Sequence, residues 1–220
     1  DVKQTACAIA GSMTSLVGDP AHLAPYLPEL LPLLKTTVVD PIPDVRAVAA
    51  RALGATVKGV GEDAVGGLLD WLKASTASNG SAVERSGGAQ GLCEVAAAIG
   101  DDCVDETIEQ MLARAKDPSP AARQGLFWFL AFLPPVLGDD FGPLLRRVFS
   151  VIVQGLADDM EVVRDIALRA GKVIVRMHGL SSTDVILPTL ESGLMHTSWR
   201  VRQCAIKLVM DLVHRAAGDE

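Results

Sequence analysis

Aromatic residues are scarce in this sequence, and no apolar run is long. Phe, Trp and Tyr make up 4% of the 220 residues, although hydrophobic residues as a whole make up 49%. The longest stretches without charge, residues 4–18 and 124–138, are shorter than the roughly 20 apolar residues that a transmembrane helix requires. The first residues do not form a secretory signal peptide. We therefore expect no membrane partner.

The residue patterns of common enzymatic and metal sites are missing as well. The four cysteines, Cys7, Cys93, Cys103 and Cys204, form no C-x-x-C pair. Isolated cysteines are typical of reduced, buried or half-buried thiols in a cytosolic protein, so we expect a cytoplasmic location. The histidines form no H-E-x-x-H motif, and no glycine-rich phosphate loop occurs. We therefore expect no catalytic residue, cofactor, metal or small-molecule substrate, and the sequence does not favour an enzyme.

Three pairs of adjacent aspartates remain as candidates for acid–base or metal chemistry. They are Asp101–Asp102, Asp139–Asp140 and Asp158–Asp159. The first two follow a glycine and open a predicted helix, and the third lies in a turn before one. Because aspartate accepts hydrogen bonds from the free N–H groups at a helix start, and its charge suits the positive helix end, we expect these pairs to cap helices.

A repeat of about 40 residues organises the whole chain. A basic residue that follows a turn recurs at spacings of 43, 39, 38, 41 and 38 residues, at Lys3, Arg46, Arg85, Arg123, Arg164 and Arg202. Fifteen residues after each of the first five stands a glycine, at Gly18, Gly61, Gly100, Gly138 and Gly179. Because glycine adopts the left-handed conformation at little cost, each of these glycines is predicted to close a helix.

Apolar residues recur with helical spacing between each basic residue and its glycine, which predicts one buried helix face per repeat. In the second repeat the stripe is Val45, Val48, Ala49, Ala52, Leu53, Thr56, Val57 and Val60. In the fifth it is Val163, Ile166, Ala167, Ala170, Gly171, Ile174, Val175 and His178. In the sixth it is Val201, Cys204, Ala205, Leu208, Val209, Leu212, Val213 and Ala216.

Another helix precedes each turn from the second repeat on, at about residues 22–38, 62–77, 101–116, 139–157 and 181–196. We call these helices first-type, and the helices that begin near the repeated basic residue second-type. Two helices in about 40 residues are the period of HEAT and armadillo repeats. The sequence therefore predicts an all-α fold, a right-handed α-solenoid of HEAT repeats (an armadillo-like superhelix), with about five helix pairs and one leading helix.

We expect residues 1–220 to form a single array that is a fragment of a longer solenoid. Its repeats are predicted at residues 1–19 (partial), 20–61, 62–100, 101–138, 139–179 and 180–220. Each helix pair is too small to bury its apolar face alone, so stacked neighbours share the core.

Positive charge is in the minority but gathers in one part of the chain. The net charge of −7 argues against a dedicated nucleic-acid-binding domain. Residues 160–217 hold eight Lys and Arg against five Asp and Glu, a net charge of +3, so the rest of the chain carries −10. Second-type helices usually line the concave face of such superhelices. Cations on them predict a basic strip for a phosphate backbone or an acidic partner.

The candidates for this strip are Arg169, Lys172, Arg176, Arg200 and Lys207. Arg164 and Arg202 hold the repeated basic position, so we expect them to be structural. A cluster of four aromatic residues, Phe127, Trp128, Phe129 and Phe132, falls in one predicted helix. Phe129 lies on the core stripe, whereas packing against the paired helix and exposure to solvent both remain open for the others. An exposed Trp128 would be an aromatic contact for a partner.

Specific stretches of the sequence resemble one protein family across essentially all 220 residues. The stretches are APYLPELLPLLK, DPIPDVRAVAARALGATVKGVGE, VERSGGAQGLCEV, LGDDF, VRDIALRAGKVIV and WRVRQCAIKLVMDLV. They are similar to the general control non-derepressible translational activator, a very large cytosolic HEAT-repeat protein. The resemblance places this chain in the central HEAT array, in or beside the region similar to fungal elongation factor three.

The resemblance implies a non-enzymatic scaffold that binds ribosomes and promotes activation of the initiation-factor-two kinase in amino-acid starvation. The implied partners are the ribosome, with ribosomal RNA contacted through the basic strip, and, through the full-length protein, the kinase and an ATP-binding-cassette protein. Two alternatives stay open. One is another HEAT scaffold, of the nuclear-import-receptor or phosphatase-regulatory-subunit type. The other is a helical accessory domain of an ATPase like elongation factor three.

Overall fold

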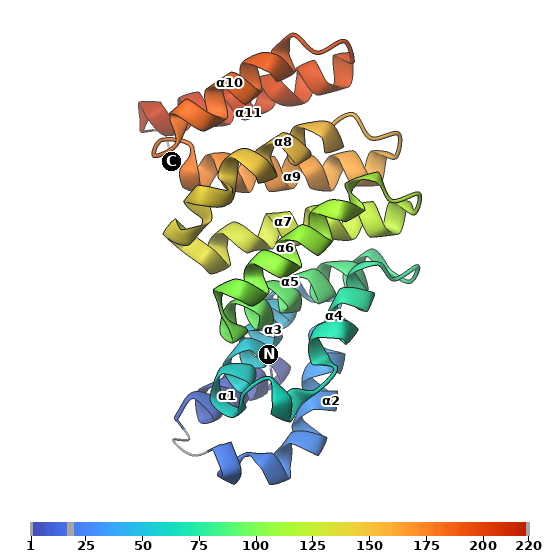
Figure 1. Cartoon of the computed structure of the whole chain (residues 1–220), viewed down its shortest axis with the longest axis vertical. Coiled ribbons are helices and arrows are strands. Elements are labelled where there is room, and N and C mark those ends of the chain that lie inside the picture. The colour runs from blue at the N-terminus through green and yellow to red at the C-terminus, as the bar shows by residue number, and fades with distance from the viewer. Residues whose placement is uncertain (1, 17–19, 219–220) are drawn as a thin grey trace. The chain divides into compact units, whose positions relative to one another are not determined.

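The computed structural model describes residues 2–16 and 20–218, and within them the chain is helical, with no β-strand. Its contacts divide it into two compact units, residues 1–111 and 112–220. The prediction of an all-α chain of stacked helix pairs is confirmed within each unit (Figure 1). The continuity of one right-handed array and the placement of the repeat boundaries stay predictions.

In the first unit, second-type helices form a row and first-type helices pack against it (Figure 1). The helices are α1 (Val2–Leu16), α2 (Leu27–Thr37), α3 (Pro43–Val60), α4 (Leu68–Thr76), α5 (Ala82–Ile99) and α6 (Asp101–Ala113), the last of which crosses the boundary between the units. Helix α3 packs against α1 on one side and α5 on the other, while α2 pairs with α3 and α4 with α5. The alternation matches the repeat read from the sequence.

The second unit repeats this arrangement. Its helices are α7 (Pro120–Leu137), α8 (Leu145–Gly155), α9 (Glu161–His178), α10 (Thr183–Leu194) and α11 (Trp199–Ala217). The second-type helices α7, α9 and α11 pack in that order. The first-type helix α8 packs against α9, and α10 packs against α11. Pro134 and Pro135 lie inside α7 near its end, and the helix runs on to Leu137.

The cores of both units follow the predicted stripes. Val45, Ala49 and Leu53 of α3 are fully buried, as are Val163 and Ala167 of α9. The end of the sixth stripe is wrong, because Val213 is 56% exposed and Ala216 is exposed. Helix α11 buries the line Val201, Ala205, Leu208 and Leu212. Val213 follows Leu212 by one residue, so it points about 100° away from that line.

The closing glycines behave as predicted at three described positions. Gly61, Gly100 and Gly138 have φ of 85°, 136° and 57°, while Gly18 lies outside the described residues. Gly179 is different, because its φ of −56° is right-handed. There the absence of a side chain matters for packing, since an added Cβ would collide with the backbone carbonyl of Val175 in its own helix and lie 2.7 Å from a Leu212 methyl carbon.

The repeated arginines hold the turns that precede the second-type helices. Each donates two hydrogen bonds from Nη1 to backbone carbonyls of its own turn. Arg164, for example, donates to the carbonyls of Asp158 at 2.7 Å and Asp159 at 2.9 Å. The same pair of bonds is made by Arg46, Arg85, Arg123 and Arg202. Arg164 and Arg202 are therefore structural, as the repeat predicted.

Aspartates also order these turns, although in a way that differs from the expected helix caps. A carboxylate oxygen of Asp158 accepts the backbone N–H of Met160, the residue before α9, at 2.9 Å. Asp158 also links adjacent repeats, because Arg123 donates to its two carboxylate oxygens from Nε at 2.7 Å and from Nη2 at 3.0 Å. The carboxylate thus satisfies the turn and a neighbouring arginine rather than N–H groups inside the helix.

The other two aspartate pairs take different places. Asp101 and Asp102 lie in the first turn of α6, where their charge suits the helix dipole. Asp139 and Asp140 lie in a short 3₁₀ helix, residues 138–144, before α8.

Candidate functional site

The predicted basic residues share positions counted from the repeated arginine of their own helix. Five residues after that arginine, at a position that we call +5, stand Trp128 in α7, Arg169 in α9 and Lys207 in α11. Seven residues are about two helical turns, so positions −2, +5 and +12 share one face of each helix. On this face Arg200 is at −2 in α11, and Arg176 is at +12 in α9.

The structure joins two of the predicted residues that the sequence treated separately. The guanidinium carbon of Arg169 lies 4.9 Å from the centroid of the Trp128 ring. Phe132, one turn further along α7, stacks on Trp128 with ring centroids 5.7 Å apart and planes 11° from parallel. Trp128 is half-buried, and within the described residues its buried indole N–H has no hydrogen-bond partner. The guanidinium of Arg169 therefore makes a cation–π contact with Trp128, and Phe132 supports the indole from within the same helix.

Two further candidates interact with neighbouring side chains. The Nζ atom of Lys172 lies 3.6 Å from a carboxylate oxygen of Asp211 in α11, so its charge is partly compensated. The guanidinium carbon of Arg200 lies 5.2 Å from the ring centroid of its neighbour Trp199, which is 58% exposed. Lys172 stands at +8, outside the shared face, and is the least suited of the five to contact a partner.

Among the five predicted basic residues, Arg176 and Lys207 make the fewest interactions with other side chains. Both are exposed, and neither has a hydrogen bond or ion pair within the described part of the chain. We call the exposed surface formed by Arg169, Arg176, Arg200 and Lys207 the basic second-helix surface. Their N–H donors are available to a phosphate or carboxylate group.

Groups suited to catalysis or metal binding are not gathered in the described residues. No cluster of three or more His, Cys, Asp or Glu side chains is placed to hold a metal ion there. The cysteines are buried or half-buried, as predicted, and none of the four is in a disulfide bond. Burial raises the pKa of the Cys93 thiol well above its usual value and raises the pKa of Cys7, Cys103 and Cys204 as well, which disfavours the reactive thiolate.

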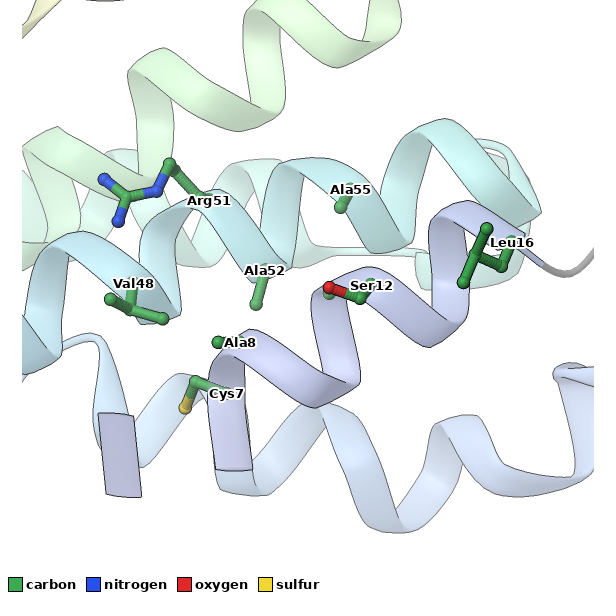
Figure 2. A pocket seen from close by; sticks show the side chains of 9 residues that line it. Cys7, Ala8, Ser12, Leu16, Val48, Arg51, Ala52 and Ala55 are labelled. Atoms are coloured by element: carbon green, nitrogen blue, oxygen red, sulfur yellow. The ribbon is translucent and has the colours of Figure 1, made fainter. Parts of the chain in front are cut away.

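Sequence reasoning missed one residue at position +5 and the groove that this residue lines. Arg51 of α3 stands at +5 in the first unit, and it lines a groove between α1 and α3 (Figure 2). Counting from the repeated basic residue would have found Arg51. The groove itself follows from the packing of two helices whose equivalent positions, such as Lys3 and Arg46, are 43 residues apart in sequence, which the pattern of one helix does not reveal. Among the described helices, none has the length and apolar character to cross a bilayer.

Comparison with known proteins identifies the helix array. Residues 1–66 match the Elongation factor 3/GNC1 HEAT repeat family, and residues 85–219 match the EF3 N-terminal HEAT repeat family. The chain is 41% identical over 218 residues to the eIF-2-alpha kinase activator GCN1 of Dictyostelium discoideum. It is 40% identical over 220 residues to the stalled ribosome sensor GCN1 of Homo sapiens.

The yeast eIF-2-alpha kinase activator GCN1 (Saccharomyces cerevisiae) is 36% identical to the chain over 218 residues. In each of these three cases the match covers 99% of this chain but 8% of the relative's length. The predicted resemblance to the general control non-derepressible translational activators is thus confirmed. The chain belongs to the HEAT-repeat family of elongation factor 3 and GNC1, and within it to a HEAT segment of the GCN1 type.

Proposed function

We propose that this chain is a non-enzymatic scaffold segment of a translational activator that binds ribosomes and promotes activation of the initiation-factor-two kinase in amino-acid starvation. Support comes from relatives whose names include kinase activator and stalled ribosome sensor. A cytoplasmic location fits this role. The kinase and the ATP-binding-cassette partner are proposed to bind through other parts of a full-length protein, since the matched segment is 8% of the relatives.

The basic second-helix surface is the proposed contact of this segment with the ribosome. The observation that carries the proposal is the shared register of its cations, which places Arg169 and Lys207 at +5 and Arg176 at +12. A phosphate backbone is a line of regularly spaced charges, and exposed cations spaced by whole turns on neighbouring helices suit such a line. Ribosomal RNA is therefore the proposed target.

Co-sedimentation with salt-washed ribosomes over a salt series tests this proposal. We expect binding that weakens with salt, and each phosphate group that a variant no longer neutralises should reduce the logarithmic slope by about 0.7–0.9. The test variant is Arg176→Glu with Lys207→Glu, because neither residue is engaged elsewhere in the described chain. We expect this variant to bind more weakly and with a shallower salt slope.

The matched control is Lys116→Glu with Arg146→Glu. Both residues are exposed in the second unit and lie outside the second-type helices, and the change in net charge is the same. Equal weakening of binding by the two double variants would reduce the effect to net charge and contradict a located contact. No binding by the folded wild-type chain would contradict the ribosome contact altogether.

One alternative keeps a specific observation in its favour. The match of residues 85–219 to the EF3 N-terminal HEAT repeat family is also what a helical accessory domain of an elongation-factor-three-like ATPase would give. The full-length sequence distinguishes the two proposals, because the ATPase requires a phosphate-binding loop elsewhere in the same polypeptide.

A further inference from the structure

A groove of about 530 Å³ runs along the contact between α1 and α3 (Figure 2). Its volume is within the range of protein ligand pockets. Small side chains make it: Ala8 and Ser12 on α1 face the α3 side, where Ala52 is buried. The two helices approach closely at its floor, because a Cβ added to Gly11 would lie 3.2 Å from the Cα of Ala52.

We call such a close contact between two second-type helices a seam. The second unit has the equivalent seam between α7 and α9. Counted from the repeated basic residue, Gly11 and Ala52 correspond to Ala131 of α7 and Ala170 of α9. Ala131 is 3% exposed and Ala170 is fully buried, so both seams are built from small residues that let second-type helices meet. The α7–α9 seam therefore shows what the space beside such a seam can hold.

The two seams differ in the residues that stand beside them. In the second unit, Trp128 at +5 and Phe132 at +9 form the stacked pair under Arg169. In the first unit the same positions hold Ala8 and Ser12. The aromatic rings that fill this place in one unit are thus missing in the other, and the groove is the space that remains.

The arginine that lies over the aromatic ring in the second unit has a counterpart in the first unit. Arg51 of α3 stands at +5, as Arg169 does in α9. Figure 2 shows the Arg51 guanidinium directed away from Ala8. On that side its charge acts on Glu94 of α5, whose pKa burial raises and Arg51 partly lowers. Arg51 is exposed and has no hydrogen bond or ion pair within the described residues, so it is free to change rotamer.

We propose that the groove binds a Trp or Phe side chain of an acidic protein segment, with Arg51 closing over the ring as Arg169 closes over Trp128. The exposed charges of the surrounding helices fit an acidic partner. Lys3 of α1 is paired with Asp40, and Arg46 is buried in its own turn, which leaves the exposed cations Arg51 and Lys58 of α3 against the exposed acid Asp44. The ring supplies apolar area and a negative π face for the guanidinium, while a flanking carboxylate is attracted by these two cations. This site is independent of the proposed ribosome contact.

The test is an NMR titration of the full chain with N-acetyl-tryptophanamide, compared with N-acetyl-leucinamide. We expect the tryptophan probe to shift the methyl signals of Ala8, Ala52 and Ala55, with a dissociation constant on the order of 1 mM for so small a ligand. The leucine probe should bind about threefold to fivefold more weakly, because it offers no π face to Arg51. Equal binding of the two probes, or shifts outside the groove, would overturn the proposal.

Two kinds of variant complete the test. Ala8→Trp with Ser12→Phe copies α7 and should abolish binding of the tryptophan probe. Ala8→Leu is a milder block at an exposed position and serves if the double variant does not fold. Arg51→Gln should remove the preference for tryptophan over leucine, whereas the control Lys116→Gln, at an exposed cation of the second unit, should keep it. Unchanged probe binding by the blocked variants would contradict the site.

Discussion

The guanidinium carbon of Arg169 lies over Trp128, 4.9 Å from the ring centroid. The two residues are 41 positions apart in sequence and share the +5 position of successive second-type helices. With Phe132 stacked on the same indole, the aromatic pair restricts Arg169, which remains an exposed residue. A restricted arginine loses less entropy when it binds an anion than a free one does.

A double-mutant cycle with Trp128→Leu and Arg169→Gln measures this interaction. We expect a coupling energy of about 0.5–1 kcal/mol, the usual range for an exposed cation–π pair. The measurement is urea unfolding of the wild type, the two single variants and the double variant. Costs that add to within about 0.3 kcal/mol would mean that the two side chains do not interact.

The repeated arginines allow a prediction that separates burial from hydrogen bonding. Arg46→Ala and Arg202→Ala each remove two hydrogen bonds to turn carbonyls. Arg46 is 9% exposed, whereas Arg202 is exposed. We expect Arg46→Ala to cost about 1.5–3 kcal/mol and Arg202→Ala clearly less, because water can replace the exposed donor. Thermal unfolding of both variants checks the order, and equal costs would contradict it.

Asp158 gives a prediction for acid pH. Burial raises the pKa of its carboxyl, but the hydrogen bonds from Arg123 and the Met160 amide outweigh burial and lower the pKa below its usual value. A lowered folded-state pKa contributes stability that is present above the unfolded pKa of about 3.9 and is lost as the pH falls through the folded value. Asp158→Asn should therefore cost about 1.5–3 kcal/mol at neutral pH.

The same variant should differ less and less from the wild type below about pH 4, because the wild-type carboxyl then also becomes neutral. Melting temperatures of both proteins from neutral pH to about pH 3 measure this convergence. Asp159→Asn, in the same turn, is the matched control with no side-chain bond to Arg123 among those described. A constant gap between Asp158→Asn and the wild type at all pH values would argue against the ionised pair.

Much of the fold follows from local sequence, and the particular residues show why. Arg164 and Arg202 are identified as structural by counting alone, because each binds carbonyls five and six residues before it. The buried line of α9 can be predicted in a similar way, because helical periodicity shows which of its residues share one face. Gly179 is only partly explained in this way, since a Cβ there would meet Leu212 of another helix as well as the backbone of its own helix.

The candidate sites depend on contacts between helices, and there the sequence is less informative. The basic residues on α9 and α11 are visible as charges, but nothing within α7 indicates that Trp128 meets Arg169. The groove beside Ala8 and Ser12 is harder still to predict, because two small residues carry no pattern of their own. Both features become readable only when equivalent positions of different repeats are compared.

His178 leads to a prediction near neutral pH. Its ring is 6% exposed and lies 5.2 Å from the Phe141 ring, and burial lowers its pKa against the opposing charge of Asp139. The neutral ring is thus favoured in the folded state. This contribution is full above the unfolded pKa of about 6.5 and is lost as the pH falls through the lower folded value. His178→Gln, which does not titrate, should flatten the fall in melting temperature between about pH 7 and pH 5. An unchanged profile would contradict a buried neutral ring.

The small residues of the second-type helices give the last prediction, which tests how closely the helices pack. Ala167 in α9 and Ala49 in α3 are both fully buried, so a larger side chain there has to displace a neighbouring helix. Ala167→Leu and Ala49→Leu should each cost about 1–3 kcal/mol through overpacking. Ala216→Leu in α11 is the control, because Ala216 is exposed and the same change adds no buried volume. Chemical denaturation of the three variants should leave the control close to the wild type. If the two buried variants were as stable as the control, the contacts between second-type helices could accept a larger side chain. Close helix packing would then not require the small residues.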